Sequence, residues 1–313
     1  MNCLAGCGGS LERDFSIGEF QVLRCRTCGL GLTAPPVPPA GIGRWYPEAY
    51  YGKENVRFNA LFELLTRWFR RRRASVLRRR VPPGAVLDVG CGRGLMLEGL
   101  RELGYAACGV ELNEAAAWHA RNRLGLDVRT GGFLDYPDQE GIFEAVVFWH
   151  TLEHFPDPDA AVARARRLLK PGGLLAVALP NSESLQARFF GRSWFHLDVP
   201  RHYTHFGTRA LEALLARHSF RVVQRDHFSL EQNPYGWVQS LYNALGFPEN
   251  LLYDLLKAPS ARSGTAREHP LACALTLALL PALLPLALLM TIVEAVLRRG
   301  GTVEVYAVKS QEK

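Results

Sequence analysis

A glycine-rich segment in the first third of the chain has the composition and spacing of a ligand-binding loop. Residues 86–94 read VLDVGCGRG, so an apolar run leads into glycines at positions 90, 92 and 94. Glycine lets the backbone turn sharply and approach a ligand closely. The dinucleotide fingerprint G-x-G-x-x-G would need a glycine at position 95, where Leu95 stands. The segment therefore predicts a turn between a buried strand and a helix that begins near Leu95, for a ligand other than a dinucleotide.

Acidic residues stand at three points where a small cationic ligand could use them. Asp88 precedes the first glycine by two residues, where it would repel a pyrophosphate and favour a ligand with an ammonium and a sulfonium. Glu111 lies 21 residues after Gly90, and a carboxylate there can accept hydrogen bonds from both hydroxyls of a ribose. Asp135 follows a third strand-like run and is suited to an adenine amine.

Strand-like and helix-like runs alternate around these residues. The strand-like runs lie at 85–89, 106–111, 128–130, 143–149, 174–179, 220–228 and 302–309. Helix-like runs lie between them at about 95–103, 114–124, 159–169 and 208–218. This alternation predicts an α/β fold with a parallel sheet covered by helices on both faces. No convincing strand is predicted between 230 and 301, so the run at 302–309 must return to the sheet after a long insert.

With these motifs, the chain resembles a class I S-adenosylmethionine-dependent methyltransferase of the ubiquinone/menaquinone-biosynthesis-like superfamily. The match runs from about Val86 to Phe228, resumes at 302–309 and includes the turn LLKPGGL at 168–174. The resemblance implies a Rossmann-like seven-stranded sheet and S-adenosylmethionine as the cofactor, in preference to a scaffold without a nucleotide or an NAD oxidoreductase. The residues expected at the cofactor are Asp88, Gly90, Cys91, Gly92, Gly94, Glu111, Leu112, Phe133, Leu134, Asp135, Trp149 and His150.

Two histidines follow the strand-like run 143–149, in the sequence HTLEHFPDP at 150–158. Ligands of open α/β sheets bind at the carboxyl ends of the strands, so His150 and His154 should lie near the methyl group. Histidine is a suitable general base near neutral pH when the acceptor is a hydroxyl. The alternative for His150 is a cap on the strand-four turn or a contact to the cofactor. The N/D-P-P-Y/F motif of amine- and amide-directed relatives is absent here, which favours an oxygen or carbon nucleophile.

A second histidine segment at 194–206 reads WFHLDVPRHYTHF. Similar D-x-P-R-H-x-x-H-F segments occur in bacterial methyltransferases that this chain resembles. We interpret the segment as a loop over the active site that presents His202 or His205 to the acceptor. Arg201 either binds an anionic acceptor or pairs with Asp198, and the sequence leaves both alternatives open.

Four of the seven cysteines lie within the first 28 residues, at Cys3, Cys7, Cys25 and Cys28. No signal peptide is read at the N-terminus, so a reducing, cytosolic setting is expected, and there clustered cysteines favour metal over disulfides. Paired cysteines at this spacing fit a zinc ribbon with four thiolates, and a module of about 30 residues needs the metal to fold. Because four thiolates complete the coordination of zinc, we expect a structural role.

The net charge of +7 comes from one segment. The 313 residues are 48% hydrophobic and 21% charged, which is ordinary globular composition and excludes a disordered chain or a small disulfide scaffold. Residues 67–80 contain eight arginines and no acid, and without them 29 basic residues face 30 acidic ones. Such a block, on a helix predicted for 56–80, could meet phosphates, anionic lipid or nucleic acid.

The insert before the last strand contains 23 residues without a charge, at 271–293. One membrane span would fit that length. Both ends of the insert must nevertheless lie on one side, because 302–309 returns to the sheet, and Pro281 and Pro285 interrupt the run. We therefore predict a helix–Pro–helix hairpin that dips into or lies on the inner leaflet, helped by the arginine block. The alternative is packing on the sheet or a dimer interface.

These observations predict five segments: a zinc ribbon at 1–33, a Pro-rich and aromatic linker at 34–55, a cofactor-binding domain at 56–230, a helical apolar insert at 231–301 and the final strand at 302–313. The expected function is methyl transfer to a membrane-proximal small molecule, lipid-linked sugar, glycan precursor or quinone, in a cytoplasmic enzyme that is peripheral on the inner face of the membrane. The alternatives are an RNA methyltransferase, motivated by the ribbon and the arginines, and a non-catalytic scaffold that binds S-adenosylmethionine. The sequence does not predict the oligomeric state.

Overall fold

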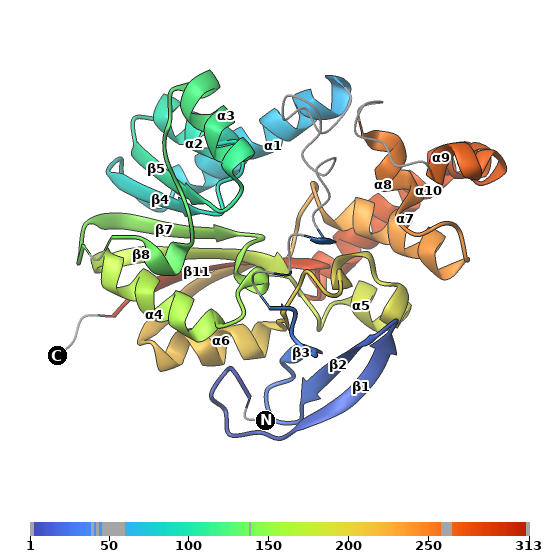
Figure 1. Ribbon diagram of the computed structural model, residues 1–313, viewed down its shortest axis with the longest axis horizontal. Helices are drawn as coiled ribbons and strands as arrows, with labels where there is room; N and C mark the ends of the chain where they lie inside the picture. Colours follow the sequence, from blue (N-terminus) through green and yellow to red (C-terminus); the bar gives the residue numbers. More distant parts are fainter. Residues whose placement is uncertain are drawn as a thin grey trace.

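The computed structural model describes residues 3–38, 41, 44–45, 60–137, 139–257 and 265–310, and its largest element is a seven-stranded sheet (Figure 1). The strand order is β10-β11-β8-β7-β4-β5-β6. All neighbouring strands are parallel except β11, which is antiparallel to both β8 and β10. The strands are β4 (Ala85–Val89), β5 (Ala106–Glu111), β6 (Asp127–Thr130), β7 (Phe143–Trp149), β8 (Leu169–Pro180), β10 (Phe220–Asp226) and β11 (Thr302–Lys309).

Helices cover both faces of this sheet, which confirms the predicted α/β, Rossmann-like architecture (Figure 1). The strands are apolar on both faces because neighbouring side chains, such as those of Val86 and Leu87, enter different cores. One core includes residues of α1 (Ala60–Arg78), α2 (Leu95–Glu102) and α3 (Glu114–Leu124). The opposite core includes residues of α4 (Pro158–Leu168), α6 (Thr208–Arg217) and the N-terminal cysteine module.

The cysteine module forms a second, antiparallel sheet with the order β1-β2-β3-β9. Its first three strands are β1 (Leu11–Ile17), β2 (Phe20–Cys25) and β3 (Gly31–Ala34). The fourth strand, β9 (Thr204–His205), comes from the second histidine segment, and it pairs Gly31 with His205 and Leu32 with Thr204. The module is therefore hydrogen-bonded to the segment that was predicted to cover the active site. Most of the predicted linker at 34–55, and the first residues of the helix predicted for 56–80, lie outside the described residues.

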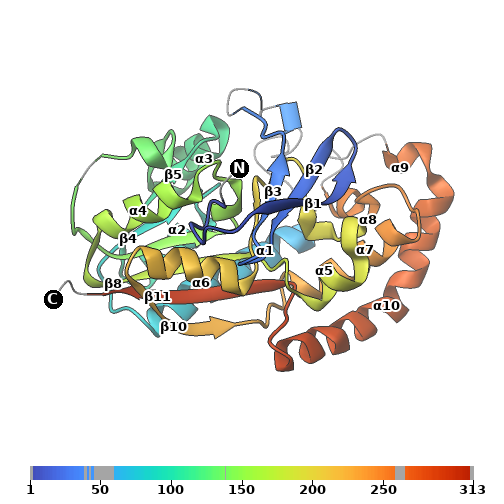
Figure 2. The ribbon, with the colours of Figure 1, turned by 90° about the horizontal axis from the view of Figure 1, so that it is seen from below.

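The region between β10 and β11 is helical, as predicted, but its apolar part is one helix and not a hairpin. It contains α7 (Asn233–Ala244), α8 (Leu251–Leu256), α9 (Thr265–Glu268) and α10 (Pro270–Val296). Pro281 and Pro285 lie inside α10, and both are exposed. Because the two prolines are four residues apart, the hydrogen bonds that they remove lie on one side of the helix, which can then curve without breaking. Figure 2 shows α10 as an arc along the edge of the molecule.

The C-terminal end of α10 is fixed to the domain by a buried carboxylate. Glu294 has no exposed surface, and it accepts hydrogen bonds from Trp237 Nε1 at 3.0 Å, Gln186 Nε2 at 3.1 Å and the Gly301 amide at 3.3 Å. Beyond this anchor the chain turns and enters the sheet as β11, between β8 and β10. Both ends of the insert thus return to the same domain, as the sequence indicated.

Short elements complete the fold near the carboxyl ends of the strands. They are the helix α5 (Leu185–Phe190) and the 3₁₀ turns η4 (Phe133–Asp135), η5 (Leu152–His154), η6 (Gly191–Ser193) and η7 (Phe195–Leu197). His154 lies in η5, and His205 lies on β9.

Candidate functional site

The glycine loop has a backbone that other residues would adopt only with strain. Gly90, Gly92 and Gly94 have φ values of 72°, 56° and 79°, and α2 begins directly after them. A Cβ atom at Gly90 would lie 2.5 Å from Thr151 Cγ2, so this glycine is also required by close packing. A Cβ at Gly92 would meet nothing within 4 Å, which shows that this part of the loop faces open space. The loop can therefore bring its backbone against a ligand at Gly92.

Two buried carboxylates lie beside the loop. Asp88 is 4% exposed, and burial raises its pKa to about 7, against the opposing effect of the Arg70 charge. Glu111 ends β5, and its two carboxylate oxygens accept hydrogen bonds from the amides of Gly92 and Asn113, both at 2.8 Å. Burial raises the pKa of Glu111, while these amides act in the opposite direction. Glu111 is thus held in one orientation between the glycine loop and the start of α3.

The residues predicted for the cofactor beyond the glycine loop differ in where their side chains lie. Leu112 and Leu134 follow β5 and β6 and are 77% and 42% exposed. Asp135 is exposed beside Leu134. Phe133 instead packs into the aromatic core, with its ring centroid 5.4 Å from that of Phe148. Leu112, Leu134 and Asp135 are therefore the side chains available to a ligand at this edge.

The side chains of Cys91 and Trp149 are not placed to make a direct polar contact with a ligand. The Cys91 sulfur packs over Gly109 of β5, and burial raises the pKa of its thiol well above the usual value. Cys91 can therefore offer its backbone, but not a reactive thiolate, to the loop. The Trp149 ring at the end of β7 is covered by the Arg73 guanidinium, whose carbon lies 4.6 Å from the ring centroid.

His150 is held directly after β7 in a left-handed backbone conformation, with φ of 54°. Its amide donates to the Ala178 carbonyl at 2.8 Å, so the residue is fixed against β8. Its Nδ1 lies 3.6 Å from Glu153 Oε1. Burial lowers the pKa of His150 to about 4, although Glu231 acts in the opposite direction. The imidazole is therefore neutral at neutral pH, which is the form that a general base requires.

His154 and His202 lie together beside a buried carboxylate. Their ring centroids are 4.7 Å apart, and both Nδ1 atoms face backbone carbonyls, of Arg201 at 3.0 Å and of His196 at 3.1 Å. Because a carbonyl only accepts, each Nδ1 carries a proton. Burial lowers the pKa of His202 well below its usual value, so the ring is neutral and its Nε2 presents a lone pair. Potential ligand atoms of Glu153, His154 and His202 lie within 4.8 Å of one another, so this cluster could hold a metal ion.

Glu153 has an environment that favours its neutral form in the absence of a cation. It is 2% exposed, and neither carboxylate oxygen accepts a hydrogen bond from another described residue. Burial raises its pKa to about 7. Sequence reasoning did not single out Glu153, although its place between His150 and His154 could have indicated it.

His205 has a different environment from the other histidines. It is 4% exposed on β9, and its Nε2 lies 3.0 Å from Thr33 Oγ1 of the cysteine module. Thr33 also donates to the His202 carbonyl at 2.6 Å, and its amide donates to the Tyr203 carbonyl at 3.0 Å. Burial lowers the pKa of His205 to about 3. The structure therefore places His205 at the joint between the module and the histidine segment, rather than at the open end of the glycine loop.

Arg201 pairs with Asp198, which is one of the two alternatives that the sequence left open. The Arg201 Nε lies 2.8 Å from Asp198 Oδ1, and Asp198 Oδ2 lies 3.7 Å from His202 Nε2. The pair therefore stabilises the turn that carries His202.

Sequence reasoning missed the contribution of α1 to the site. Arg73 is only 2% exposed, and its guanidinium pairs with Glu231 at 2.5 Å while it covers Trp149. The charge of Arg70 acts on Asp88, His150 and Glu231. The spacing of Arg70, Arg73 and the buried Leu77 puts them on one helix face, and this periodicity could have identified the buried side of the arginine block.

Other arginines of the block also have partners within the chain. Arg67 pairs with Glu98 of α2 and Arg71 with Glu102. The Arg80 guanidinium lies over the Tyr306 ring, 3.9 Å from its centroid. Several of the arginines that were predicted to contact lipid or nucleic acid therefore help to hold α1 against the domain.

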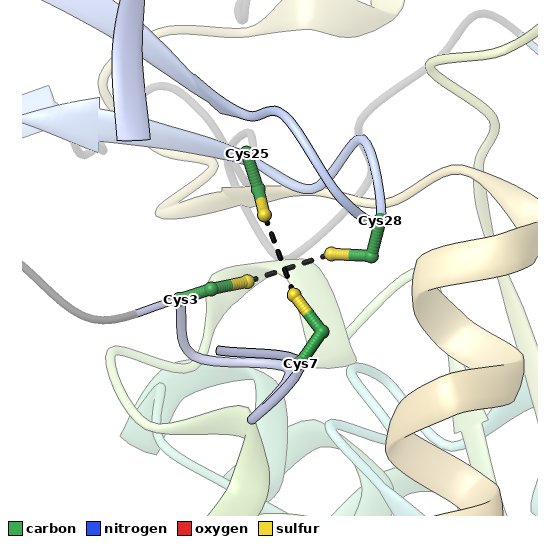
Figure 3. Close-up of side chains that lie close together, drawn as sticks. All are labelled: Cys3, Cys7, Cys25 and Cys28. Carbon is green, nitrogen blue, oxygen red and sulfur yellow. Dashed lines mark hydrogen bonds between the residues drawn. The ribbon is translucent and has the colours of Figure 1, made fainter. Parts of the chain in front are cut away.

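The four N-terminal cysteines converge on one point. Figure 3 shows their sulfur atoms directed at a common centre, two from the loop at Cys3 and Cys7 and two from the turn after β2 at Cys25 and Cys28. The Cys3–Cys28 and Cys7–Cys25 sulfur pairs are each 3.4 Å apart. Four sulfurs at this separation fit tetrahedral coordination of zinc, in which each Zn–S bond is about 2.3 Å long.

Comparison with known proteins identifies the fold that carries this site. A family model described as a methyltransferase domain matches residues 57–225, which is more than half of the 313 residues. The chain belongs to this methyltransferase family. Its seven-stranded sheet, with one antiparallel strand between β8 and β10, is the fold of class I S-adenosylmethionine-dependent methyltransferases.

Curated relatives match the methyltransferase over a shorter stretch. A ubiquinone biosynthesis O-methyltransferase of Xanthomonas oryzae pv. oryzae is 39% identical over 102 residues, which is 31% of this chain and 43% of the relative. The protein of the same name from Thiobacillus denitrificans is 39% identical over 94 residues, 28% of this chain and 40% of the relative. The match thus spans less than half the length of these relatives.

Solved structures share the fold at low sequence identity. One is a chain of the complex between the Haloferax volcanii Trm112 methyltransferase activator and a putative methyltransferase, with a TM-score of 0.50, 17% identity, and 79% of this chain and 91% of that chain covered. Another is Haemonchus contortus phosphoethanolamine N-methyltransferase 2 in complex with S-adenosyl-L-methionine, with a TM-score of 0.50, 16% identity, and 77% and 52% covered.

The joint between the cysteine module and the histidine segment gives a first prediction. Thr33→Val keeps the shape of the side chain but removes the donor to the His202 carbonyl and the partner of His205 Nε2. We expect the free energy of unfolding to fall by about 1–3 kcal/mol, because both groups are buried. Urea unfolding of both proteins measures this. Thr66→Val is the control, since the Thr66 hydroxyl donates to the Phe62 carbonyl within the same helix, α1. Equal stability of the two variants would contradict the expectation.

Proposed function

We propose that this methyltransferase transfers the methyl group of S-adenosylmethionine to an oxygen or carbon nucleophile of a small molecule. The observation that carries the proposal is the carboxylate of Glu111, which two backbone amides fix beside the open glycine loop. An oxygen acceptor is supported by the curated relatives, whose names describe ubiquinone O-methylation. Because the match covers less than half of those relatives, we propose a quinone as one acceptor within this class of small molecules, and we do not restrict the class to quinones.

The cofactor site has a partner for each part of S-adenosylmethionine, which supplies an electrophilic methyl group when bound. Glu111 would accept from the ribose hydroxyls. Leu112 and Leu134 offer exposed apolar side chains to the two sides of the adenine, and Asp135 an acceptor to its amine. Asp88 would attract the ammonium of the methionine part, while the Arg70 charge nearby suits its carboxylate.

The reactive end of the site has a neutral base in a fixed position. His150 is neutral at physiological pH, and its amide is tied to Ala178 of β8. It can therefore take the proton from a hydroxyl as the oxygen attacks the methyl group, while the backbone holds the ring in line. His154 and His202, beside Glu153, would orient the acceptor from the opposite side, and His205 would support the segment that carries them.

Methyl transfer can be tested before the acceptor is identified. The protein is incubated with methyl-labelled S-adenosylmethionine and a cell extract, and total RNA, lipid and soluble small molecules are then separated. We expect label in the lipid or the small-molecule fraction. Label only in RNA would replace our proposal by RNA methylation, and no label together with no cofactor binding would indicate a non-catalytic scaffold.

A variant pair makes the same assay specific for the base. His150→Gln should lower the rate of labelling about 100-fold or more if a hydroxyl is the acceptor, because general base catalysis contributes at least that much. His218→Gln is the matched control, since His218 pairs with Asp159 of α4 and lies between the end of α6 and the amino end of β10. An equal effect of both substitutions would remove His150 from the mechanism.

The pKa of Asp88 predicts how cofactor binding depends on pH. Its carboxylate form attracts the ammonium, and this form becomes the major one only as the pH rises through about 7. The Kd for S-adenosylmethionine should therefore decrease between pH 6 and pH 7.5. Asp88→Asn should bind about tenfold more weakly at pH 7.5 and lose this pH dependence. Calorimetric titration measures the Kd and its pH dependence. The control is Asp127→Asn, at the opposite end of β6 from the site. A pH dependence that persists in Asp88→Asn would exclude Asp88 as the group that binds the ammonium.

A structural zinc ion at Cys3, Cys7, Cys25 and Cys28 is part of the proposal. Its support is the convergence of four sulfurs, because thiolates this close repel each other unless a cation lies between them. Elemental analysis of the purified protein should return one zinc per chain, and Cys25→Ser together with Cys28→Ser should abolish it. Zinc at the wild-type level in that variant would contradict this ligand set.

A membrane-proximal acceptor, such as a lipid-linked sugar, a glycan precursor or a quinone, is supported by α10. Among the described residues, α10 is the helix long and apolar enough to cross a membrane, with a mean hydropathy of 2.3 and 11% of its most apolar window buried. Because both of its ends belong to one domain, we infer that α10 lies on the inner face of the bilayer and does not cross it. The protein would then be peripheral, with its acceptor drawn from the membrane.

Flotation with anionic vesicles tests this arrangement. Wild-type protein should float with vesicles that contain phosphatidylglycerol, and Leu277→Glu with Leu284→Glu should remain at the bottom, because charges on this exposed face oppose insertion. The control carries the same two charges at exposed positions elsewhere, as Trp118→Glu with Val223→Glu. Equal flotation of the two variants would exclude α10 as the contact.

A further inference from the structure

A second pocket, of about 570 Å³, lies beside the histidine segment and outside the cofactor site. Its floor is formed where the chain leaves β8 at Asn181 and Ser182, and the Ser182 hydroxyl donates to the His205 carbonyl at 3.2 Å. The residues after α10, Arg298 and Arg299, form another wall. The proposed methyl transfer uses none of these side chains.

The rim of this pocket has an excess of positive charge. Five arginines line it, against the single carboxylate of Glu183. Arg209 pairs with Glu183, and Arg225 pairs with Glu212 on α6. Within the part of the chain that the structure describes, Arg188, Arg298 and Arg299 form no ion pair with a carboxylate. All three side chains are exposed, so water screens their mutual repulsion, but an anion placed between them would be attracted by all three.

A buried histidine in the same wall has an unused polar atom. His227 is 7% exposed, and its Nδ1 makes no hydrogen bond to the described residues. A buried polar atom without a partner is costly, but this Nδ1 has almost no accessible surface and does not face the pocket directly. The histidine therefore forms part of the pocket wall, and the arginines supply the charged contacts.

The backbone that carries Arg298 and Arg299 is fixed rather than loose. The Arg299 carbonyl accepts from the Leu185 amide at 3.0 Å, and the Asn181 amide donates to the Gly301 carbonyl at 2.9 Å. A Cβ atom at Gly300 would clash with the His227 carbonyl, so this turn packs directly against the wall that contains the histidine. The charged groups are thus presented by a defined turn, as a binding site requires.

We propose that this pocket binds a phosphate group, with Arg188, Arg298 and Arg299 as its charged contacts and His227 at its wall. Planar guanidinium groups bind phosphate oxygens in pairs, and three unpaired ones match a phosphate dianion or a pyrophosphate better than a single carboxylate. The phosphate belongs either to a soluble phosphate ester or to a lipid headgroup, because the pocket opens directly after the exposed apolar helix α10. The site does not depend on the methyl-transfer proposal, since no residue of the cofactor pocket is part of it.

Calorimetric titration of the full chain with sodium pyrophosphate tests the soluble form of this ligand. Wild-type protein should bind one pyrophosphate per chain with a saturable isotherm. Arg298→Gln with Arg299→Gln should weaken binding about tenfold or more, because each substitution removes a charge-assisted contact. The control, Arg123→Gln with Arg129→Gln, removes the same charge at the opposite edge of the sheet, at α3 and β6, and should bind as the wild type does.

Sedimentation with vesicles distinguishes the second source of the phosphate. The same variants are mixed with phosphatidylcholine vesicles that contain or lack phosphatidic acid. A loss of association with the phosphatidic acid vesicles in Arg298→Gln/Arg299→Gln, but not in the control, assigns the pocket to a lipid phosphate, whether or not pyrophosphate binds. If neither pyrophosphate nor phosphatidic acid binding differs between this variant and the control, the pocket is not a phosphate site and the proposal fails.

Discussion

The hydrogen bonds between β3 and the histidine segment hold together two parts of the chain that are about 170 residues apart. Thr33 contacts the His202 carbonyl, the His205 ring and the Tyr203 carbonyl from one strand position. The position of His202 beside His154 and Glu153 depends on these contacts, because the segment between η7 and α6 has only the two residues of β9 in regular structure. The cysteine module is therefore part of the framework of the site rather than an appendage, and a metal bound by its four sulfurs would support the histidines at a distance.

Burial of charge is the second feature that shapes the site. Asp88, Glu153 and His150 all shift toward their neutral forms because water is excluded around them. Arg73 is buried in the same region, paired with Glu231 and stacked on Trp149. Such a region has a low effective dielectric constant, in which a cationic cofactor and a developing oxyanion interact strongly with the few charges present. The helix α1 thus contributes electrostatics to the site as well as a cover for the sheet.

Much of the fold could be predicted because it is encoded locally. The runs at 85–89, 106–111, 143–149 and 302–309 coincide with strands of the sheet, since their apolar composition and the turn residues between them specify buried strands. The cysteine cluster followed from spacing alone. The hairpin predicted for 271–293 was wrong, because two prolines on the same exposed side bend a helix without ending it. The rule that proline interrupts a helix does not consider on which face of the helix the lost hydrogen bonds lie.

The parts of the site that could not be predicted from the sequence depend on contacts between residues far apart in the chain. The partner of His205 is Thr33, and the partner of Arg73 is Glu231, and no local pattern connects either pair. The buried face of the arginine block was hidden because its charge suggested a solvated helix. The side chains of Leu112 and Leu134, which were predicted beside the cofactor, are exposed, whereas the core position of Phe133 became visible only from its packing with Phe148.

The position of β11 has a consequence for biosynthesis. This strand lies between β8 and β10, yet it follows α10 in the chain, so a ribosome delivers the most apolar helix before the strand that completes the sheet. Until residues 302–309 emerge, β8 and β10 have open edges toward each other, and such edges are prone to wrong pairing. The nascent chain thus passes through an interval in which an exposed apolar helix and an incomplete sheet are present together. Early contact of α10 with a bilayer or a chaperone would protect both from aggregation.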